Sequence, residues 1–529
     1  RLYCWAGNGM SVANKLLQAA AGNAAGEAVY VDDVFSTYLY EGNNTGGSTP
    51  TNTITNGIDL DGEGGLVWLK ARSDAASHNL IDTERGVGKY LSCDGTSTEG
   101  TPNSGFGLTA FNSDGFTLGG NWNTENFNGY DYVSWTFRKQ PKFFDVVTYT
   151  GNGAAGNTVS HNLGSVPGMM IVKRLDAADD WVVYHRKADA SAPEDKFLNL
   201  NDTGAVADDV GKWNDTAPTS TEFTLGINTH VNGNGGTYVA YLFAHDEQDF
   251  GENSDEAIIK CGSYTGNNSA TGPAIDLGFE PQWVMIKNAD TTGNWNIYDS
   301  MRGIVTGGNE PFLHANNTGA DNYTTDRIQL TSTGFQVLTN SPNVNSAHDF
   351  IYMAIRRPHK PAKELEATDV FHIATKNDKG STGPSFDSPF SVDFATRKQV
   401  NNSGIWETGA RLMGEKSLRL NDTDAESSNS AMQFDYQSGW FEDGSAIPDT
   451  NNLAWMWRRV PGFFDVVAYS GDNTTNQQVP HNLGVAPELM ILKLRNSTSD
   501  WAVYTAATSA AGFLRLNTTA AYQTGSYRG

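Results

Sequence analysis

The stretch Gly462–Lys493, GFFDVVAYSGDNTTNQQVPHNLGVAPELMILK, decides the fold of this chain, because it recurs 320 positions earlier as KFFDVVTYTGNGAAGNTVSHNLGSVPGMMIVK, Lys142–Lys173. The two copies share Phe-Phe-Asp and His-Asn-Leu-Gly with the same spacing and no gap. Both consist of short β-branched and aromatic runs bounded by Gly, Asn, Asp and Pro, which is typical of strands and turns. The chain is therefore a tandem repeat of β structure.

Weaker copies fill the space around this pair. A third copy starts at Ser263 as SYTGNNSATGPAIDLGFEPQWVMIK, and Val67–Gly86, VWLKARSDAASHNLIDTERG, belongs to a fourth. The second half of each copy recurs too, as an Asn-rich turn (FLNLNDT from Phe197, LRLNDT from Leu418, LRLNTT from Leu514), a Gly-aromatic strand and an apolar strand. Three copies of roughly 107 residues make one superrepeat of 320.

These copies predict an all-β fold of tandem antiparallel β-sandwich units of about 105 residues, jelly-roll or immunoglobulin-like, after a short N-terminal helix. Ser11 as N-cap and Gly22 as the stop bound that helix. The predicted domains are residues 1–29 (arm and helix), 30–141 (unit 1), 142–256 (unit 2), 257–361 (unit 3), 362–461 (unit 4, divergent) and 462–529 (unit 5, incomplete). Residues 356–368 form a charged, proline-bearing linker.

Unit 5 ends soon after its LRLNTT turn, whereas unit 2 continues through two more strand-like runs after FLNLNDT. A sandwich without its last strands would expose open sheet edges. We therefore expect either a longer native polypeptide or a partner that supplies the missing strands.

Bulk composition narrows the classes of partner. Sixty acidic against 36 basic residues give a net charge of −24 and a pI near 4.7, so nucleic acid and anionic lipid surfaces would be repelled. No apolar run is long enough for a transmembrane helix, and we expect no membrane insertion. Three widely spaced cysteines, Cys4, Cys93 and Cys261, indicate buried apolar side chains rather than a disulfide framework or a zinc site.

Several recurring residues invite a chemical interpretation. His161 and His481 lie in the His-Asn-Leu-Gly motif, but the third copy has Ile275 there, which favours a turn or capping role over catalysis or metal binding. Trp181, Trp295 and Trp501 each precede a tyrosine by three positions on a strand, so the two rings face opposite sides. A core role for them is favoured over a sugar-stacking shelf.

Asp176, Asp179 and Asp180 form a carboxylate cluster that calcium could use, but the equivalents Asp290 and Asp500 keep only part of it, which favours a solvated acidic turn. No hydrolase, zinc-protease, phosphate-loop or dinucleotide motif is present in its required context. We therefore expect no catalytic residue, no cofactor and no metal site. Trp122 and Trp213, taken as exposed loop residues, are the candidate ligand-binding residues.

The opening VYVDDVFSTYLYEGN, the later IDTERG and the junctions WTFRKQPKFFDVVTYTGNG and WMWRRVPGFFDVVAYSGD carry a family resemblance. Over residues 28–529 the chain resembles repeat-domain virion structural or tail-fibre-like proteins of marine tailed phages, including cyanophages. The resemblance implies a non-enzymatic virion component on an extracellular particle, self-associated, joined to other virion proteins and attaching to a host surface glycan. A soluble glycan-binding protein and a polysaccharide-degrading tailspike remain as alternatives.

Overall fold

The computed structural model describes residues 28–120, 124–377, 383–401, 403–428, 432–442, 451–472, 474, 476–507 and 512–524. These residues are almost entirely strands and connecting loops, with two short α-helices and five short 3-10 helices. The prediction of an all-β fold of antiparallel sandwiches is confirmed. The expected helix from Ser11 to Gly22 lies outside the described residues.

Every sheet is built from strands of a single unit, and the same strand order returns from unit to unit. In units 1 to 3 the first strand pairs with the last strand, the last with the third, and the third with the fourth. A second, smaller sheet covers one face of the first. Because the first strand of an immunoglobulin domain pairs with its second, this order differs from the immunoglobulin order.

Unit 1 opens with the 3-10 helix η1 (Val31–Asp33). Its larger sheet has the order β1 (Phe35–Glu41), β7 (Asp131–Arg138), β3 (Gly65–Ala71), β4 (Asn79–Asp82), and its smaller sheet β2 (Asn52–Thr55), β6 (Gly115–Leu118), β5 (Leu108–Asn112). The strand β3 is buried along its whole length, because it lies at the centre of its sheet and is covered on both faces.

Unit 2 is the most elaborate unit. Its larger sheet has the order β13 (Ala207–Asp208), β12 (Lys196–Asn199), β11 (Trp181–His185), β10 (Met169–Arg174), β15 (Thr237–Phe243), β8 (Phe144–Thr150), and its smaller sheet pairs β14 (Glu222–Leu225) with β9 (Asn157–Ser160). Three short helices lie in its loops: η2 (Pro193–Asp195), α2 (Val210–Trp213) and α3 (Thr229–Asn232).

Unit 3 repeats this plan with β16 (Ile259–Thr265), β23 (Asp349–Arg356), β18 (Pro281–Asn288), β19 (Asn296–Asp299), β20 (Leu313–His314) in one sheet and β17 (Ala274–Asp276), β22 (Gly334–Val337), β21 (Ile328–Thr331) in the other. Unit 4 begins with η3 (Ala362–Glu364) and η4 (Ala367–Asp369). Its sheets are β24 (Phe371–Thr375), β30 (Asn452–Trp457), β25 (Phe394–Gln399), β26 (Trp406–Ala410), β27 (Leu418–Arg419), and β28 (Met432–Gln433), β29 (Phe441–Glu442), with η5 (Arg411–Met413) between β26 and β27. Its described strands β24, β30, β25 and β26 have the same order as the equivalent strands of units 1 to 3.

Unit 5 has one described sheet, in the order β31 (Leu489–Leu492), β32 (Ala502–Thr505), β33 (Gly512–Arg515), β34 (Gln523–Thr524). Its third-strand equivalent β31 is exposed, from 38% at Leu492 to 59% at Leu489, whereas Met169–Val172 of β10, 320 positions earlier, are at most 1% exposed. In unit 2 the strand β15 covers that edge of β10.

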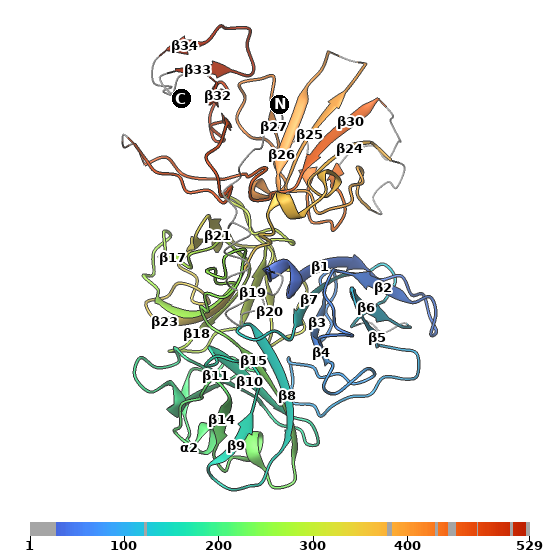
Figure 1. Cartoon of the computed structure of the whole chain (residues 1–529), viewed down its shortest axis with the longest axis vertical. Coiled ribbons are helices and arrows are strands. Elements are labelled where there is room, and N and C mark those ends of the chain that lie inside the picture. Colours follow the sequence, from blue (N-terminus) through green and yellow to red (C-terminus); the bar gives the residue numbers. More distant parts are fainter. Residues whose placement is uncertain are drawn as a thin grey trace, which may run out of the picture.

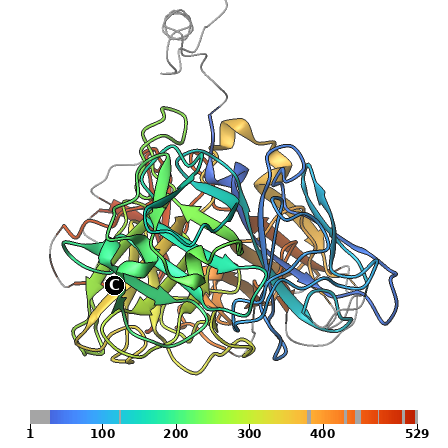
Figure 2. The same cartoon turned by 90° about the horizontal axis from the view of Figure 1, so that it is seen from below.

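The largest hydrophobic core belongs to no single unit. It joins Trp135 and Phe137 of unit 1, Phe243 of unit 2 and Trp283 of unit 3, all at most 1% exposed. Smaller cores lie in units 1, 3 and 4, and the core of unit 3 also includes Leu412 of unit 4. In Figure 1 units 1 (blue), 2 (teal to green) and 3 (yellow-green) meet around this shared core, and units 4 (orange) and 5 (red) form a second group above them. Figure 2 shows the first three units packed together from another side.

The linker at residues 356–368 is folded against unit 1. The backbone amides of His359 and Lys360 donate to the Asp32 carboxylate (2.9 and 3.1 Å), and the His359 ring contacts Tyr30 edge-on at 5.2 Å. This contact brings the end of unit 3 back to the start of unit 1. The two groups of units are thus joined by an ordered segment that spans them.

Candidate functional site

The recurring polar residues of the repeat meet at the interfaces between units, and these interfaces form the candidate functional site. Unit 2 shows the arrangement on unit 1. The Lys173 ammonium donates to the Thr96 carbonyl (3.2 Å), and the Asp179 amide donates to the same oxygen (2.9 Å). The Trp181 indole N–H donates to the Ser92 carbonyl (3.1 Å), and the Glu99 amide donates back to Leu175 (3.0 Å).

We call this set of contacts a clamp and divide it into two halves. The donor half consists of a lysine side chain, the backbone carbonyl two residues after it, the backbone amide six residues after it and the aromatic side chain eight residues after it. The acceptor loop contains three groups. They are a threonine whose carbonyl accepts the hydrogen bond from the lysine, the backbone carbonyl four residues before that threonine, and the backbone amide three residues after it. All of these groups lie at fixed sequence distances from one lysine and one threonine.

The clamp recurs with the same spacing at three more interfaces. Unit 3 clamps unit 2 through Lys287 Nζ to Thr203 O (3.3 Å) and Trp295 Nε1 to Asn199 O (2.9 Å). Unit 5 clamps unit 4 through Lys493 Nζ to Thr423 O (3.2 Å) and Trp501 Nε1 to Arg419 O (2.8 Å). The amide contacts also recur: Gly293 to Thr203, Val206 to Ala289, Ser499 to Thr423 and Glu426 to Arg495.

Unit 1 in turn clamps unit 3, which closes a ring of three. Lys70 Nζ donates to Thr318 O (3.3 Å), and His78 occupies the position of the tryptophan, with Nε2 3.0 Å from His314 O. The Trp68 indole donates to His78 Nδ1 (2.9 Å), so the imidazole carries its proton on Nε2 and donates it across the interface. Burial holds the pKa of His78 well below its usual value, which keeps this ring neutral.

The clamp lysines Lys70, Lys173 and Lys287 are fully buried, and Lys493 is partly buried. Burial lowers the pKa of Lys70, Lys173 and Lys287 to about 8 in each case, and it lowers that of Lys493 as well. Backbone carbonyls accept from each ammonium, which partly replaces the water lost on burial. A lysine inside an otherwise apolar strand is thus explained by the carbonyls of the neighbouring unit.

Beside each of the three clamps within units 1 to 3, a second contact joins the fourth strand of one unit to the last strand of its neighbour. Trp135 of unit 1 donates its indole N–H to Asp299 of unit 3 (3.1 Å), and the Tyr241 hydroxyl of unit 2 donates to Asp82 of unit 1 (2.8 Å). At the equivalent position unit 2 has His185, whose Nε2 lies 3.1 Å from Tyr352 O of unit 3. Burial lowers the pKa of His185 to about 3, so it too is neutral.

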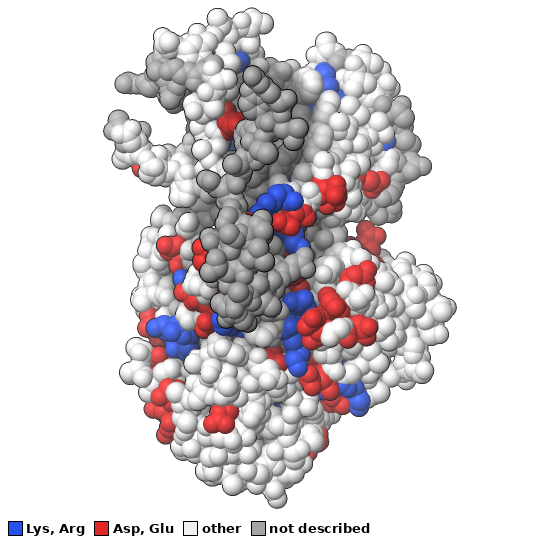
Figure 3. All heavy atoms as spheres, viewed as in Figure 1, with Lys and Arg blue, Asp and Glu red and all other residues white. Residues whose placement is uncertain are grey.

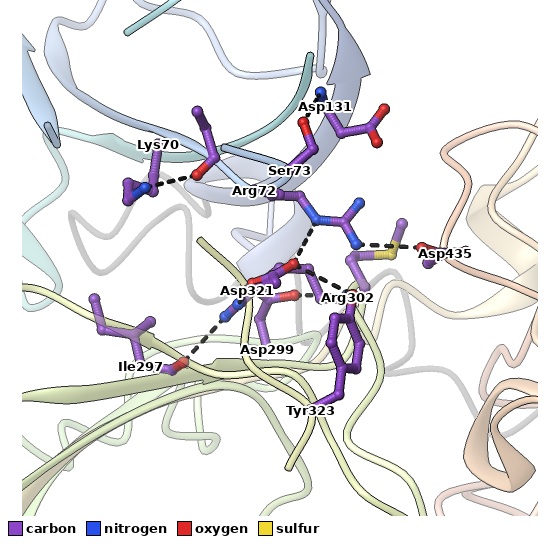
Figure 4. A network of polar contacts seen from close by, with 12 residues as sticks. Lys70, Arg72, Ser73, Asp131, Ile297, Asp299, Arg302, Asp321, Tyr323 and Asp435 are labelled. Atoms are coloured by element: carbon purple, nitrogen blue, oxygen red, sulfur yellow. Dashed lines mark hydrogen bonds and ion pairs between the residues drawn. The ribbon is translucent and has the colours of Figure 1, made fainter. Parts of the chain in front are cut away.

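An ion-pair network closes the join between units 1, 3 and 4 (Figure 4). Arg302 contacts Asp299 through Nε and Asp321 through Nη1, both at 2.6 Å. Arg72 of unit 1 contacts the same Asp321 (3.0 Å) and reaches Asp435 of unit 4 (3.2 Å). The neighbouring carboxylates Asp321 and Asp435 hold the pKa of Arg72 above its usual value, against the effect of burial. In Figure 3 charged side chains on the viewed face gather around the seams between units.

The histidines and tryptophans chosen from sequence have structural roles. His161 Nδ1 and His481 Nδ1 accept from the amides two residues later, Leu163 (3.3 Å) and Leu483 (3.2 Å), which confirms the turn role. The core role of Trp181, Trp295 and Trp501 is also confirmed, since they are 0%, 2% and 6% exposed. Cys93 and Cys261 are free and fully buried, as expected, whereas Cys4 lies outside the described residues.

The acidic cluster makes contacts within unit 2. Asp179 pairs with His230 Nε2 (2.8 Å), Asp176 pairs with Arg174 (2.9 Å), and Asp180 accepts from Asn201 (2.9 Å). Within the described ranges no group of His, Cys, Asp and Glu side chains is arranged to hold a metal ion. No helix among the described residues is long and apolar enough to cross a membrane.

The expected exposure of Trp213 is wrong. Trp213 ends helix α2, is 1% exposed and donates its indole N–H to the Lys196 carbonyl (3.0 Å). Its ring packs edge-on against Tyr184, because the Asp209 cap turns the helix onto the sheet. Trp122, the other candidate ligand-binding residue, lies outside the described residues.

Sequence reasoning identified the repeat but did not assign the clamp. Its signal was present: a lysine in an apolar strand with an aromatic ring eight residues later, and an Asn-rich turn ending in threonine. Comparison with curated proteins and with solved structures finds no match. A family model described as a domain of unknown function, DUF7483, matches residues 31–358 and 463–528, which are units 1 to 3 and most of unit 5. The chain therefore belongs to the DUF7483 family.

Proposed function

We propose that this chain is a non-enzymatic structural component of a phage virion, a tail-fibre or appendage subunit that displays β-sandwich units for attachment to a host surface. The proposal rests on the resemblance of residues 28–529 to repeat-domain virion proteins and on one structural observation. Residues that recur from copy to copy hold units together, through the clamp at four interfaces.

This use of the recurring residues supports a scaffold more than an enzyme. An enzyme needs at least one set of polar side chains converging on a substrate. Here the recurring lysines, tryptophans and threonine carbonyls converge on one another, across interfaces that are buried. The loops outside the clamps vary between units, which suits a rigid support that carries different surfaces.

The glycan-binding alternative loses one of its two candidate residues, because the Trp213 ring is buried. We keep a host-surface glycan as the proposed target of the assembled particle. Weak binding by single units would be strengthened by many copies on one particle.

Particle composition tests the virion assignment. Quantitative mass spectrometry of density-purified phage from infected cultures should find the chain at a fixed ratio to the major capsid protein. Its signal should stay in the particle band after a high-salt wash that removes loosely bound host proteins. Consistent absence from intact particles, with the chain present in the lysate, would refute the assignment.

Attachment is tested separately with the purified chain. Preincubating host cells with it should slow phage adsorption in a dose-dependent way, and cells of a resistant strain should bind none of it. Incubation of host polysaccharide with the chain should release no reducing ends. Catalytic release of reducing ends would instead identify the tailspike alternative.

A further inference from the structure

The described chain contains five donor halves and five acceptor loops, but only four clamps. The lysines are Lys70, Lys173, Lys287, Lys398 and Lys493, and the threonines are Thr96, Thr203, Thr318, Thr423 and Thr519. The four clamps use every lysine except Lys398 of unit 4 and every threonine except Thr519 of unit 5. One half of each kind therefore takes no part in these four clamps, and the two halves belong to units that are already clamped to each other.

The remaining donor half lies against its own unit. Lys398 Nζ donates to Gly404 O (2.6 Å), and the Trp406 ring, eight residues after the lysine, stacks on Trp455 at 5.3 Å. The residue two positions after the lysine, Val400, is 55% exposed, and Ile405 beside the ring is 42% exposed. At the clamped positions equivalent to Val400, Arg72 is 8% and Ala289 is 5% exposed, and Leu175 and Arg495 are partly buried.

The remaining acceptor loop is open in the same way. Three residues before the threonine, Leu516 of unit 5 is 45% exposed. The equivalent residues of the loops of units 1, 2 and 3, which carry a clamp, are Cys93, Leu200 and Ala315, and each is fully buried. In the fourth clamped loop, that of unit 4, the equivalent Leu420 is partly buried. An apolar side chain at this position is thus fully or partly covered where a donor half sits on the loop.

Units 1 to 3 show which partner engages a donor half and an acceptor loop of two units that are clamped to each other. Unit 2 clamps unit 1, and unit 3 then occupies the third position: it clamps unit 2 with Lys287 and receives Lys70 of unit 1 on its Thr318 loop. Units 4 and 5 repeat the first of these steps with the same contacts. Their remaining halves are those that a third unit engages in the first ring.

We propose that units 4 and 5 are two thirds of a second three-unit ring, and that a β-sandwich unit of this same repeat type occupies the third position. That unit presents an Asn-Thr loop to Lys398 and Trp406 of unit 4. It also places its own lysine and ring on the Thr519 loop of unit 5. This inference concerns assembly and does not depend on the virion assignment.

The test uses a chain in which Thr519 is followed directly by a second copy of residues 204–361. The added residues give unit 5 copies of the strands that follow Thr203 in unit 2, among them β15, which pairs with β10, and they append a copy of unit 3. A shorter chain adds residues 204–256 only and carries no third unit. Both chains keep the whole of the natural sequence up to Thr519.

Thiol labelling reports whether the third position is filled. Val400→Cys is introduced into the original and both extended chains, with Val210→Cys, at a residue 56% exposed on α2 of unit 2, as the matched control. Maleimide should label the thiol at position 400 at least tenfold more slowly in the long chain than in the original and short chains. Labelling at position 210 should be equal in all three.

A broken donor half supplies the specific control. Lys287→Glu and Trp295→Ala, made only in the appended copy, should restore fast labelling at position 400 in the long chain. Equal labelling at that position in all folded, monomeric chains would overturn the proposal. Aggregation of the long chain, with the short chain folded, would also count against the proposal, because the added unit would then not bind between units 4 and 5.

The original chain, without added residues, tests whether a second copy of the chain occupies the third position. Light scattering should find its Val400→Cys variant monomeric, with fast thiol labelling at every concentration. Head-to-tail association that protects the introduced thiol and is abolished by Trp406→Ala would make a second copy of the chain the occupant. That result would overturn the proposal of a single third unit.

Discussion

At the residue scale, the indole N–H of each clamp tryptophan bonds to a carbonyl of the neighbouring unit. Trp295→Phe removes the indole hydrogen bond to Asn199 O, in a partly buried site. We expect a loss of about 1–3 kcal/mol in the free energy of unfolding, measured by urea titration. Hydrogen exchange should also become faster at residues 199–203 of unit 2.

Trp213→Phe is the matched control for this change. It removes one indole bond of similar length, to Lys196 O, but inside unit 2. It should cost a similar free energy without selectively increasing exchange at residues 199–203. Equal exchange in that loop for both variants would contradict a specific role of Trp295 in joining the units.

A second residue-scale prediction concerns a buried carboxyl group. Glu310 is fully buried, its Oε1 accepts from the amides of Arg327 (2.8 Å) and Ile328 (3.1 Å), and burial raises its pKa to about 8. The folded state therefore binds more protons than the unfolded state between about pH 4.5 and 8. Stability from this group is present below that window and is lost as the pH rises through it.

Glu310→Gln keeps the Oε1 acceptor and removes the charge. The free energy of unfolding should rise by about 1–3 kcal/mol at about pH 8 and stay nearly unchanged at about pH 4.5. Urea titrations across this pH range measure the difference, with the exposed Glu63→Gln as the control. A variant curve parallel to that of the original chain would show that Glu310 is ionised in the folded state.

At the element scale, the same sequence pattern can be buried or exposed according to its neighbour strand. Ile171 of β10 and Ile491 of β31 lie 320 positions apart and pair with Val183 and Val503 in the same register. Ile171 is 1% exposed and Ile491 is 47% exposed, because β15 covers β10. Strand propensity alone does not distinguish the two.

Introducing a charge makes this difference measurable. Ile171→Asp places a carboxylate in the shared core, and we expect a loss of at least about 4 kcal/mol, or failure to fold. Ile491→Asp should change the free energy of unfolding by less than about 1 kcal/mol. Thermal and urea unfolding measure both, and comparable losses would mean that β31 is covered in solution.

The elements themselves were largely predictable from sequence. Met169–Arg174 and Thr237–Phe243 are short runs bounded by turn residues and rich in β-branched or aromatic side chains, which predicts the strands that the structure has there. The pairing of units was not predictable, because clamp contacts end on backbone carbonyls, which carry no sequence signal of their own. Because His78 replaces the tryptophan in unit 1, the sequence pattern of the clamp is also harder to recognise at the interface that closes the ring.

At the scale of the whole molecule, units 1 to 3 share one core and should unfold together. Trp283 of unit 3 packs against Trp135 (6.3 Å between ring centroids) and Phe137 (6.4 Å) of unit 1. A chain of independent units would lose stability only in the unit that is changed. A closed ring with a common core instead couples the three units.

Trp283→Ala removes a buried tryptophan side chain that joins units 1 and 3, and we expect a loss of about 3–5 kcal/mol in the free energy of unfolding. Because the core is shared, hydrogen exchange in urea should show β7 of unit 1, β10 of unit 2 and β18 of unit 3 losing protection at one lowered midpoint. Phe386→Ala, in the separate core of unit 4, should leave that midpoint unchanged. If β7 and β10 keep their original midpoint while β18 unfolds early, the three units do not form one cooperative ring.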